Sequence, residues 1–523
     1  MPTRKVLTLI AGLIMACALA GPASASPADI QRGLGPEPDS LHIHKAQGLA
    51  AVNLLRDIRE GLVTFDAAGE LVPGQAESWE VLDGGRLYRF RLRPDARWSN
   101  GETVVAADFI RAWRRAFTPG TAAPTSGLLK PVLNAEAILG GDMGVESLGI
   151  AAPEPAIVEI SLEAPAPWIL EILAHPVAFP LHESGIDDAR TAPVNGPYVI
   201  AAWTPRASIR LERNSEYYAA ESVRTGVVEY FPIEEPSTEL ARYRAGELEI
   251  TESIPAGRFA WLAENMPADL RIHPYLGTFW LGVNFHHGAL GRSAELRQAL
   301  SLAINREILV EKVLGAGELP GWSVVPPGIE GYQPARMLYA DASQQERENE
   351  ARRLFQRSGF GRDEPLRLEL RYNTSGVHRR VAVAVSAMWR QVLGVNTDLV
   401  NEEWKVFVSN RRMGVVTQVF RGGWIADYAD PSSFLDLFAG DTRLSGTFYA
   451  DETYDELLRK AAGASGADRM ELLRQAEFRL MRDMPAIPLY YYVSRHLVRP
   501  ELDGFVDNVR DIHLSRYLEL KDP

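Results

Sequence analysis

The sequence predicts an α/β protein, and a strand, a helix and a second strand that follow one another late in the chain carry that prediction. Residues 366–372 alternate apolar and polar side chains like a half-buried strand. Residues 378–393 have a helical pattern that Gly394 closes, and residues 395–400 form the next strand. Because such a unit joins parallel strands through a right-handed crossover, this part of the chain should hold a parallel sheet.

Earlier segments add antiparallel strands and a helix to this fold class. Residues 79–82 and 88–92 flank a turn at 83–85, an order that predicts a β-hairpin. A helix should follow the next turn, because three large aromatic side chains recur at positions i, i+4 and i+8, namely Phe109, Trp113 and Phe117.

Two further elements are predicted in the C-terminal half. Ser343 and Glu346 make a capping box for a charged helix that should end at Gly359. Residues 415–421 alternate like a strand, which should run into the glycine pair at 422–423.

The first 25 residues have the pattern of a targeting segment. A positively charged start precedes an apolar stretch at 6–19 that is too short to span a bilayer, and a small-residue pattern ends at Ala25. We expect a signal peptide at residues 1–25, cleavage after Ala25 and export to the periplasm. In a second interpretation, the four residues that end at Cys17 are a lipobox, and Cys17 would carry a lipid anchor.

Charge and cysteine usage narrow the function classes. The 523 residues include 55 Lys and Arg against 68 Asp and Glu, a formal net charge of −13, and cleavage would remove two more cations, Arg4 and Lys5. An acidic chain of this kind is a poor partner for nucleic acid, whose phosphates require clustered cations. The single cysteine, Cys17, lies in the segment that should be removed, so the mature protein should contain neither a disulfide nor a reactive thiol.

The sequence contains no catalytic signature. The motifs of α/β-hydrolases, P-loop enzymes and zinc proteases are missing. The close histidine pairs, His42 with His44 and His286 with His287, are expected to be solvated loop residues rather than metal ligands. We therefore predict no enzymatic activity, metal or cofactor, because a secreted hydrolase, the alternative, would need a nucleophile or metal constellation that the sequence does not show.

One segment combines tryptophans, glycines and a carboxylate. If a strand ends at the glycine pair, Trp424 and Asp427 lie on the loop beyond it, where open α/β sheets bind their ligands. A carboxylate flanked by Trp404 and Trp424 suits a cationic ligand group in an apolar cleft. A structural role is equally open at this point, in which Asp427 caps a turn before Asp430 and the tryptophans belong to the core.

A series of short motifs extends in order over nearly the whole chain after residue 25. The motifs are Glu60–Val63, Pro73–Trp79, Arg93–Gly101, Asp108–Phe109, Asn195–Tyr198, Leu211–Asn214 with Tyr217, Tyr243–Glu247, Tyr372–Ser375 with His378, Asn401–Lys405, Gly423–Tyr428 and Tyr490–Val493. Together they resemble the large periplasmic oligopeptide-binding proteins of ABC importers.

The resemblance implies a two-lobed periplasmic-binding-protein fold with a hinge, and an extra α/β domain inserted in the N-terminal lobe. By position, residues 26–59, 186–276 and 495–523 should form lobe I, residues 60–185 the extra domain and residues 277–494 lobe II. The implied partners are oligopeptides and the membrane permease subunits of an ABC importer, and the protein should be a monomer.

The resemblance also implies a role for each site residue. Asp427 matches an aspartate that pairs with the peptide α-amino group. Gln47, Gly48 and Leu49 match a segment that bonds the peptide main chain, with Gly423 and Ile425 on the other side of the peptide. Trp404 and Trp424 match pocket walls, and three residues match positions that meet the C-terminal carboxylate or acidic side chains, namely His378, Arg411 and Arg421.

The sequence departs from the family pattern at a few positions. Family members have a tyrosine in place of Thr125, a glutamate in place of Gln47 and a cysteine pair in place of Gly277 and Ile425. These changes leave the preferred side chains open. Within the same fold, the ligand could instead be a cell-wall peptide, a metal chelate, haem or a sugar, and the chain could be a ligand-sensing subunit.

Overall fold

The computed structural model describes residues 29–46, 48–118, 120–121, 123, 125–185, 191–255, 257–286, 288–361, 363–415, 418–440, 442 and 444–521. The expected signal peptide, its cleavage site, Cys17 and Gln47 lie outside these residues. None of the helices in the described part of the chain has the length and apolar character needed to cross a membrane.

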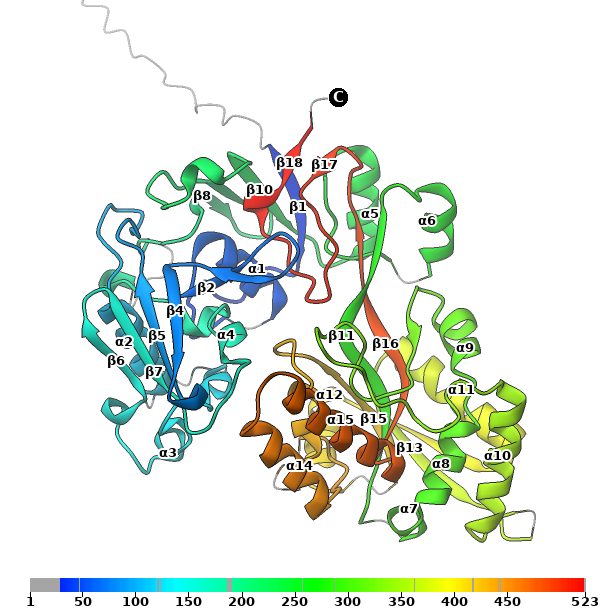
Figure 1. The fold of residues 1–523 in the computed structure, drawn as a ribbon. Coiled ribbons are helices and arrows are strands. Elements are labelled where there is room, and N and C mark those ends of the chain that lie inside the picture. The colour runs from blue at the N-terminus through cyan, green and yellow to red at the C-terminus, as the bar shows by residue number, and fades with distance from the viewer. Residues whose placement is uncertain are drawn as a thin grey trace, which may run out of the picture.

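Lobe I is built on a four-stranded sheet whose strands come from distant parts of the chain (Figure 1). In sheet order, these are β1 (Ile30–Gly35), β10 (Val227–Pro232), β9 (Ser208–Arg213) and β8 (Tyr198–Thr204). The first two are parallel and the others antiparallel. Helix α1 (Leu49–Ile58) lies on the side of this lobe that faces lobe II (Figure 1).

A second four-stranded sheet forms the extra α/β domain. Its strands are β4 (Ala76–Leu82), β5 (Leu87–Leu92), β7 (Ile157–Ser161) and β6 (Ile150–Glu154), all antiparallel. The predicted hairpin is confirmed by the pairing of Leu82 with Leu87, and the predicted helix is α2 (Ala106–Phe117), whose three aromatic side chains are buried. Two shorter helices complete the domain, α3 (Ala135–Gly140) and α4 (Ile169–Ile172).

Lobe II contains a six-stranded mixed sheet. The strand order is β12 (Leu319–Pro320), β16 (Ala486–Leu497), β11 (Leu270–Val283), β15 (Val419–Ile425), β13 (Arg367–Asn373) and β14 (Asn396–Glu402). The predicted strand–helix–strand unit is confirmed, because β13 and β14 are parallel neighbours joined by α11 (Gly376–Leu393). The capping box of Ser343 and Glu346 is also confirmed, at the start of α10 (Gln344–Arg357).

The remaining helices and strands are short or peripheral. They are β2 (Val63–Phe65), β3 (Leu71–Pro73), α5 (Pro236–Ala245), α6 (Phe259–Asn265), α7 (Gly288–Arg292), α8 (Ala294–Leu302), α9 (Arg306–Ile308), α12 (Trp404–Arg412), α13 (Ser432–Leu435), α14 (Glu452–Ala462), α15 (Gly466–Asp483), β17 (Leu502–Asp503) and β18 (Glu519–Leu520).

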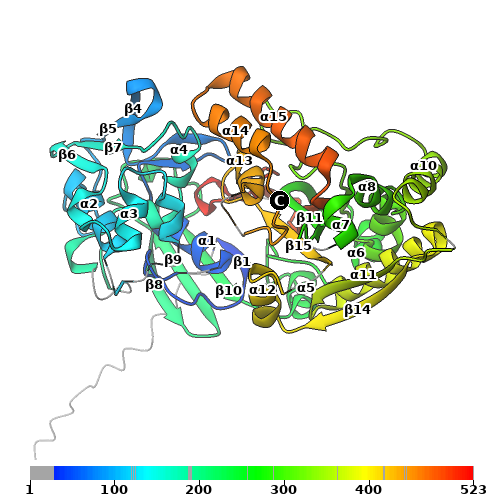
Figure 2. The same cartoon turned by 90° about the horizontal axis from the view of Figure 1, so that it is seen from below.

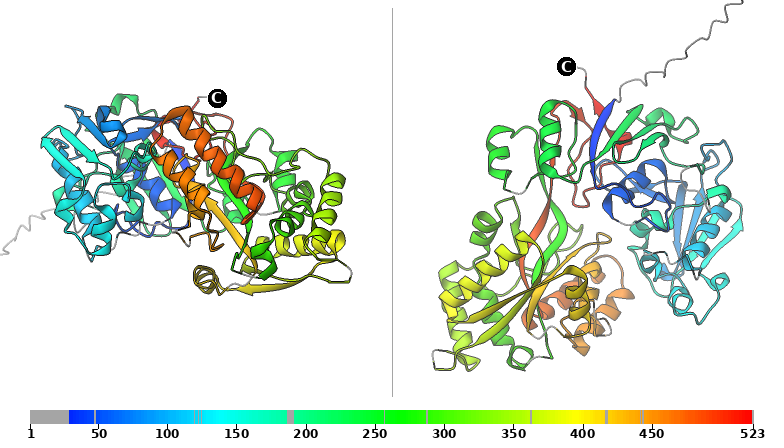
Figure 3. Two further views of the ribbon diagram at one scale, coloured as in Figure 1. Left: turned by 60° about the horizontal axis from the view of Figure 1, so that its bottom comes forward. Right: turned by 180° about the vertical axis from the view of Figure 1, so that it is seen from behind.

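Two long strands connect the lobes. β11 leaves lobe I and enters lobe II, and β16 returns beside it in antiparallel register from Gly282 with Ala486 to Leu270 with Leu497 (Figures 1 and 3). Such paired crossings form a hinge about which lobes can rotate.

The apolar core is divided differently from the sheets. One buried cluster runs continuously from Leu34 through the extra domain to Tyr230 and includes Ile512, so lobe I and the extra domain share it. A separate cluster, from Leu276 to Tyr490, fills lobe II.

His42 and His44 are not the solvated loop residues that the sequence predicted. Both are buried, because the loop before α1 packs into the core through Leu41 and Ile43. His42 Nδ1 accepts the backbone N–H of His44 at 3.1 Å. Burial, with the nearby positive charges of His42, Arg115 and Arg59, lowers the pKa of His44 to about 3.

Candidate ligand-binding site

Three of the predicted site residues follow the three neighbouring strands β14, β13 and β15. His378 lies in the first turn of α11, after β13, and Trp404 is the first residue of α12, after β14. Asp427 comes two residues after β15 ends. Because β13 is parallel to both neighbours, these three residues leave the same edge of the sheet. That edge is where open α/β sheets bind ligands.

The sequence placed the end of β15 too early. The strand was expected to end before the glycine pair, but it continues to Ile425, so Trp424 lies within the strand and not on the loop. The glycines pair with β11, and a Cβ on Gly422 would meet Trp280 Nε1 at 2.1 Å. Glycine therefore marks the close approach of a ring rather than a strand end. Residues 416 and 417 of the expected strand lie outside the described residues.

Asp427 has a solvent-accessible side chain whose carboxylate forms no ion pair with any described residue. Its backbone N–H donates to Ser433 Oγ at 3.2 Å, and Trp424 Nε1 donates to the same oxygen at 3.4 Å. Partial desolvation of the carboxylate by the surrounding protein raises the pKa of Asp427 to about 6.

The turn after Asp427 is held by Asp430 instead. Asp430 Oδ1 accepts the backbone N–H of Ser432 at 2.9 Å, and the same carboxylate binds both terminal nitrogens of buried Arg469, at 2.6 and 2.9 Å. The capping role considered for Asp427 therefore belongs to its neighbour, which leaves the Asp427 carboxylate available.

A cationic cluster is formed by Arg421, within β15, and Arg411, near the end of α12, with His378 close by. The pKa of Arg411 is lowered to about 10 by burial and by the adjacent charge of Arg421. Burial and Arg421 also lower the pKa of His378 to about 4. Neither arginine forms an ion pair with a carboxylate among the described residues. His378 is uncharged at neutral pH, so the two arginines, which have no acidic partner among the described residues, make this a place for an anionic ligand group.

Aromatic rings hold Arg421 in position. Its guanidinium carbon lies 5.3 Å from the centre of the Phe279 ring and 5.9 Å from that of Trp404, and Nη2 donates to Tyr492 Oη at 3.4 Å. Phe279 and Tyr492 were not identified as site residues from the sequence. The run of tyrosines at 490–492 was the available signal for Tyr492.

The tryptophans differ in exposure. Trp404 is 49% exposed, as expected for a pocket wall, and its ring stacks on Phe407 at 6.4 Å. Trp424 is half-buried against the core of lobe II, so part of its surface has a structural role. Ile425, at the end of β15, is 46% exposed and presents apolar surface to solvent near Trp424.

On lobe I, Gly48 and Leu49 form the start of α1. Gly48 has φ 79° and ψ 159°, a conformation essentially restricted to glycine. Leu49, the first residue of α1, is 57% exposed although its side chain is apolar. No described contact joins Gly48 or Leu49 to Asp427. Gln47, which directly precedes Gly48, lies outside the described residues.

Gly277 and Ile425 are directly opposite each other in the β11–β15 register. The resemblance described above implies a cysteine pair at these two positions in other members, and cross-strand neighbours are close enough for a disulfide. Here a Cβ on Gly277 would lie 2.6 Å from the Tyr492 ring, so glycine makes room for that tyrosine.

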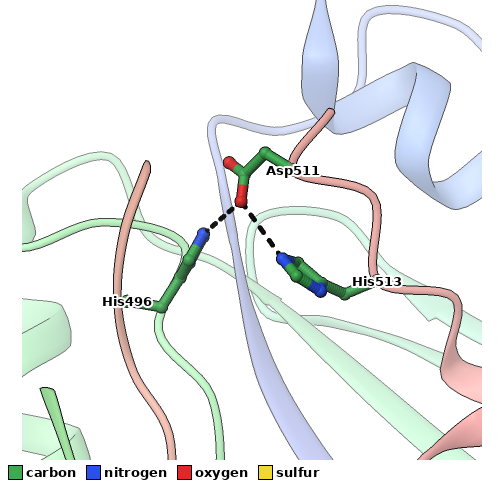
Figure 4. Close-up of side chains that lie close together, drawn as sticks. All are labelled: His496, Asp511 and His513. Carbon is green, nitrogen blue, oxygen red and sulfur yellow. Dashed lines mark hydrogen bonds and ion pairs between the residues drawn. The ribbon is translucent and has the colours of Figure 1, made fainter. Parts of the chain in front are cut away.

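One group of three potential metal ligands exists among the described residues, outside the cleft. His496, Asp511 and His513 have one ligand atom each within 4.8 Å of one another (Figure 4). Both histidines bond the same carboxylate oxygen, and His496 Nδ1 lies 2.8 Å from the Thr251 carbonyl. The three residues thus form a hydrogen-bonded network that links the end of β16 to the C-terminal segment.

Comparison with known proteins places this architecture in a family. Residues 70–446 match the middle region of the bacterial extracellular solute-binding proteins, family 5. The periplasmic oligopeptide-binding protein OppA of Salmonella typhimurium is 36% identical over 99% of both chains. Two solved structures are also similar.

The unliganded open form of the murein tripeptide-binding protein MppA has a TM-score of 0.86 and 32% identity, covering 95% of this chain and 98% of that one. OppA of Haemophilus influenzae in complex with the peptide RPPGFSPFR has a TM-score of 0.75 and 32% identity, with 94% and 99% covered. This chain therefore belongs to family 5 of the bacterial extracellular solute-binding proteins.

Proposed function

We propose that the protein binds oligopeptides in the periplasm and delivers them to the permease subunits of an ABC importer, as a monomer and without a catalytic step. The observation that carries this proposal is the polarity of the cleft. Among the described residues, the carboxylate of Asp427, two residues beyond β15, has no ion-pair partner, and neither has Arg421, within β15, nor Arg411 near it. A peptide with a free amine and a free carboxylate has the complementary charges.

Strand β15 also offers backbone groups to an extended ligand. β11 pairs with it along its whole length, whereas β13 pairs only with Val419 and Phe420. Among the described strands, residues 421–425 thus have one edge without a partner. An extended peptide can add there as a strand, with main-chain bonds that do not depend on its sequence. Gly48 and Leu49 would contact its other side from lobe I.

The length of this edge limits the ligand. Arg421 and Asp427 are six residues apart, so at about 3.3 Å per residue their Cα atoms lie within roughly 20 Å of each other. An extended peptide of up to about six residues spans the same distance. We infer that short peptides satisfy both charged ends at once and that longer peptides must leave the cationic cluster behind.

The domain limits belong to the same proposal. Residues 26–59, 186–276 and 495–523 are assigned to lobe I, 60–185 to the extra domain and 277–494 to lobe II. The start of the lobe II core at Leu276 supports the boundary on β11. Closure about the β11–β16 hinge would bring lobe I against the ligand, and contacts with both lobes would favour the closed form.

Calorimetry on protein stripped of co-purified ligand tests the function. Trialanine and unrelated tri- to pentapeptides should bind with similar affinity, whereas N-acetylated trialanine and free alanine should bind much more weakly. A metal chelate, haem or a sugar that binds tightly while peptides give no heat would refute the oligopeptide assignment. Peptide-dependent stimulation of the cognate importer ATPase would test delivery.

A further inference from the structure

The extra domain touches lobe II directly beside Asp427. Helix α4 of the extra domain lies next to the loop that precedes α13 (Figure 2). Within that contact, a carboxylate oxygen of Glu171 accepts the backbone N–H of Ala429 at 2.7 Å. Ala429 is two residues after Asp427, so a side chain 258 positions away fixes the backbone of the proposed amine-binding loop.

Glu171 is held by a third part of the chain. Arg510, in the C-terminal segment, donates from Nη2 to Glu171 Oε1 at 2.7 Å and from Nη1 to the Gly69 carbonyl at 2.9 Å. The side chains of Glu171 and Arg510 are only 17% and 16% exposed. A half-buried pair with a second anchor is oriented before any ligand arrives, unlike a surface ion pair.

Stacked side chains reinforce the hydrogen bond. The ring of Trp168 stacks on Tyr428 with 5.8 Å between centres and 14° between planes. On the same ring, the guanidinium carbon of Arg469 lies 4.8 Å from the centre, and Arg469 is the partner of Asp430. Tyr428 and Ala429 therefore contact Trp168 and Glu171, at the start of α4 and within it. Asp430 is connected to Trp168 through Arg469.

The contact is reciprocal between the lobes. Tyr428 of lobe II packs against the core shared by lobe I and the extra domain. In return Val509, beside Arg510, packs against the core of lobe II, and its carbonyl accepts the backbone N–H of Leu276 on β11 at 3.0 Å. We call the six residues of this contact the clasp, namely Trp168, Glu171, Tyr428, Ala429, Val509 and Arg510.

We propose that Glu171 is a positioning residue, which through Ala429 holds the loop so that the Asp427 carboxylate faces the ligand amine. This inference rests on the proposed function. Glu171 lies behind the loop and its carboxylate is occupied by Ala429 and Arg510, so its effect on binding passes through Asp427. The clasp is also a third connection between the lobes, beside β11 and β16, and the only one of the three that is not covalent.

The Glu171→Ala variant tests the inference. In ligand-free protein, hydrogen exchange at the Ala429 amide should become faster, because its acceptor is gone. Affinity for trialanine should fall on the order of tenfold, as for the loss of a hydrogen bond to a charged group. Affinity for N-acetyl-trialanine should change by less than about twofold, since without the amine no partner for Asp427 is present.

Two further variants make the test specific. Glu171→Gln keeps an acceptor for Ala429 and should restore most of the preference for the free amine. Glu159→Ala is the matched control, because Glu159 is also in the extra domain, pairs with Arg89 at 2.8 Å and is 22% exposed, but lies in β7 away from lobe II. It should leave both affinities and the Ala429 amide unchanged.

Several outcomes would overturn the inference. Unchanged exchange at Ala429 in Glu171→Ala would show that the hydrogen bond does not hold the loop. Faster exchange with a wild-type ratio of free to acetylated affinity would reduce Glu171 to a structural residue. A wild-type protein that binds both peptides equally refutes the proposed amine recognition itself, and the role of Glu171 with it. Failure of the proposed function is thus distinguished from failure of the Glu171 inference, because it is measured in the wild-type protein.

Discussion

His496 Nε2 lies 2.8 Å from Asp511 Oδ1, which joins the lobe I end of the hinge strand β16 to the C-terminal segment (Figure 4). Burial alone would lower the pKa of His496, but the charge of Asp511 and its hydrogen bond raise it to about 9. The same pairing holds the pKa of Asp511 well below its usual range, against the effect of burial. His496 is therefore an imidazolium at neutral pH.

This pair predicts a loss of stability in mild alkali. A histidine whose pKa rises from 6.5 to about 9 on folding stabilises the protein fully below pH 6.5, and that contribution disappears as the pH rises through 9. The loss is on the order of 3 kcal/mol. The melting temperature should fall between pH 7 and 9.5 in the wild type and much less in His496→Gln. Parallel curves for the two proteins would contradict the assignment.

Removing the charge of Asp427 should abolish the preference for a free amine. In Asp427→Asn the ligand ammonium has no partner, a change that typically costs roughly 3–5 kcal/mol, or on the order of a hundredfold or more in affinity. N-acetylated peptides should bind the variant and the wild type alike, so the two perturbations do not add. Calorimetry with both peptides measures this. A lower melting temperature with an unchanged affinity ratio would instead assign Asp427 to the turn.

The raised pKa of Asp427 predicts how peptide binding depends on pH. The carboxylate must be ionised to pair with an ammonium, and before a ligand binds its pKa is about 6. Affinity for a free-amine peptide should be level between about pH 6.5 and 7.5 and should fall below pH 6, by about tenfold per pH unit at the limit. The N-acetylated peptide should lack this dependence. A flat profile down to pH 4.5 would show that the carboxylate does not contact the amine.

The cationic cluster is tested with the other end of the peptide. Arg421→Ala should weaken binding of a short peptide with a free carboxylate by roughly tenfold, because a charge-assisted bond is lost. A C-terminally amidated peptide should be affected much less. Arg367→Ala is a suitable control, since Arg367 on β13 forms an exposed ion pair with Asp398 on β14. Equal losses for both peptides would assign Arg421 to packing between Phe279 and Trp404.

The sequence predicted those parts of the fold whose determinants are local. The hairpin at 76–92, the capping box at Ser343 and the unit from β13 to β14 each depend on residues within a short window, and each is confirmed. The predicted end of β15 was wrong because Gly422 is required by the close approach of Trp280 on β11, more than a hundred residues away.

The candidate site divides in the same way. The alternation and the parallel strands indicated which loop follows the sheet edge, and the family resemblance supplied the roles. The capping role of Asp430 depends on Arg469, and the clasp on Glu171 and Arg510, and these long-range pairs leave no periodic signal in the sequence. The burial of His44 has the same cause, because it depends on the core around it.

The apolar core shared by lobe I and the extra domain determines how many cooperative units unfold on heating. Because the two share one apolar cluster and lobe II has its own, heating should give at most two calorimetric transitions rather than three. A ligand that bridges the cleft binds only while both units are folded, so it should shift both transitions upward and draw them together. Three sequence domains would then behave as two cooperative units, and as one when the cleft is filled.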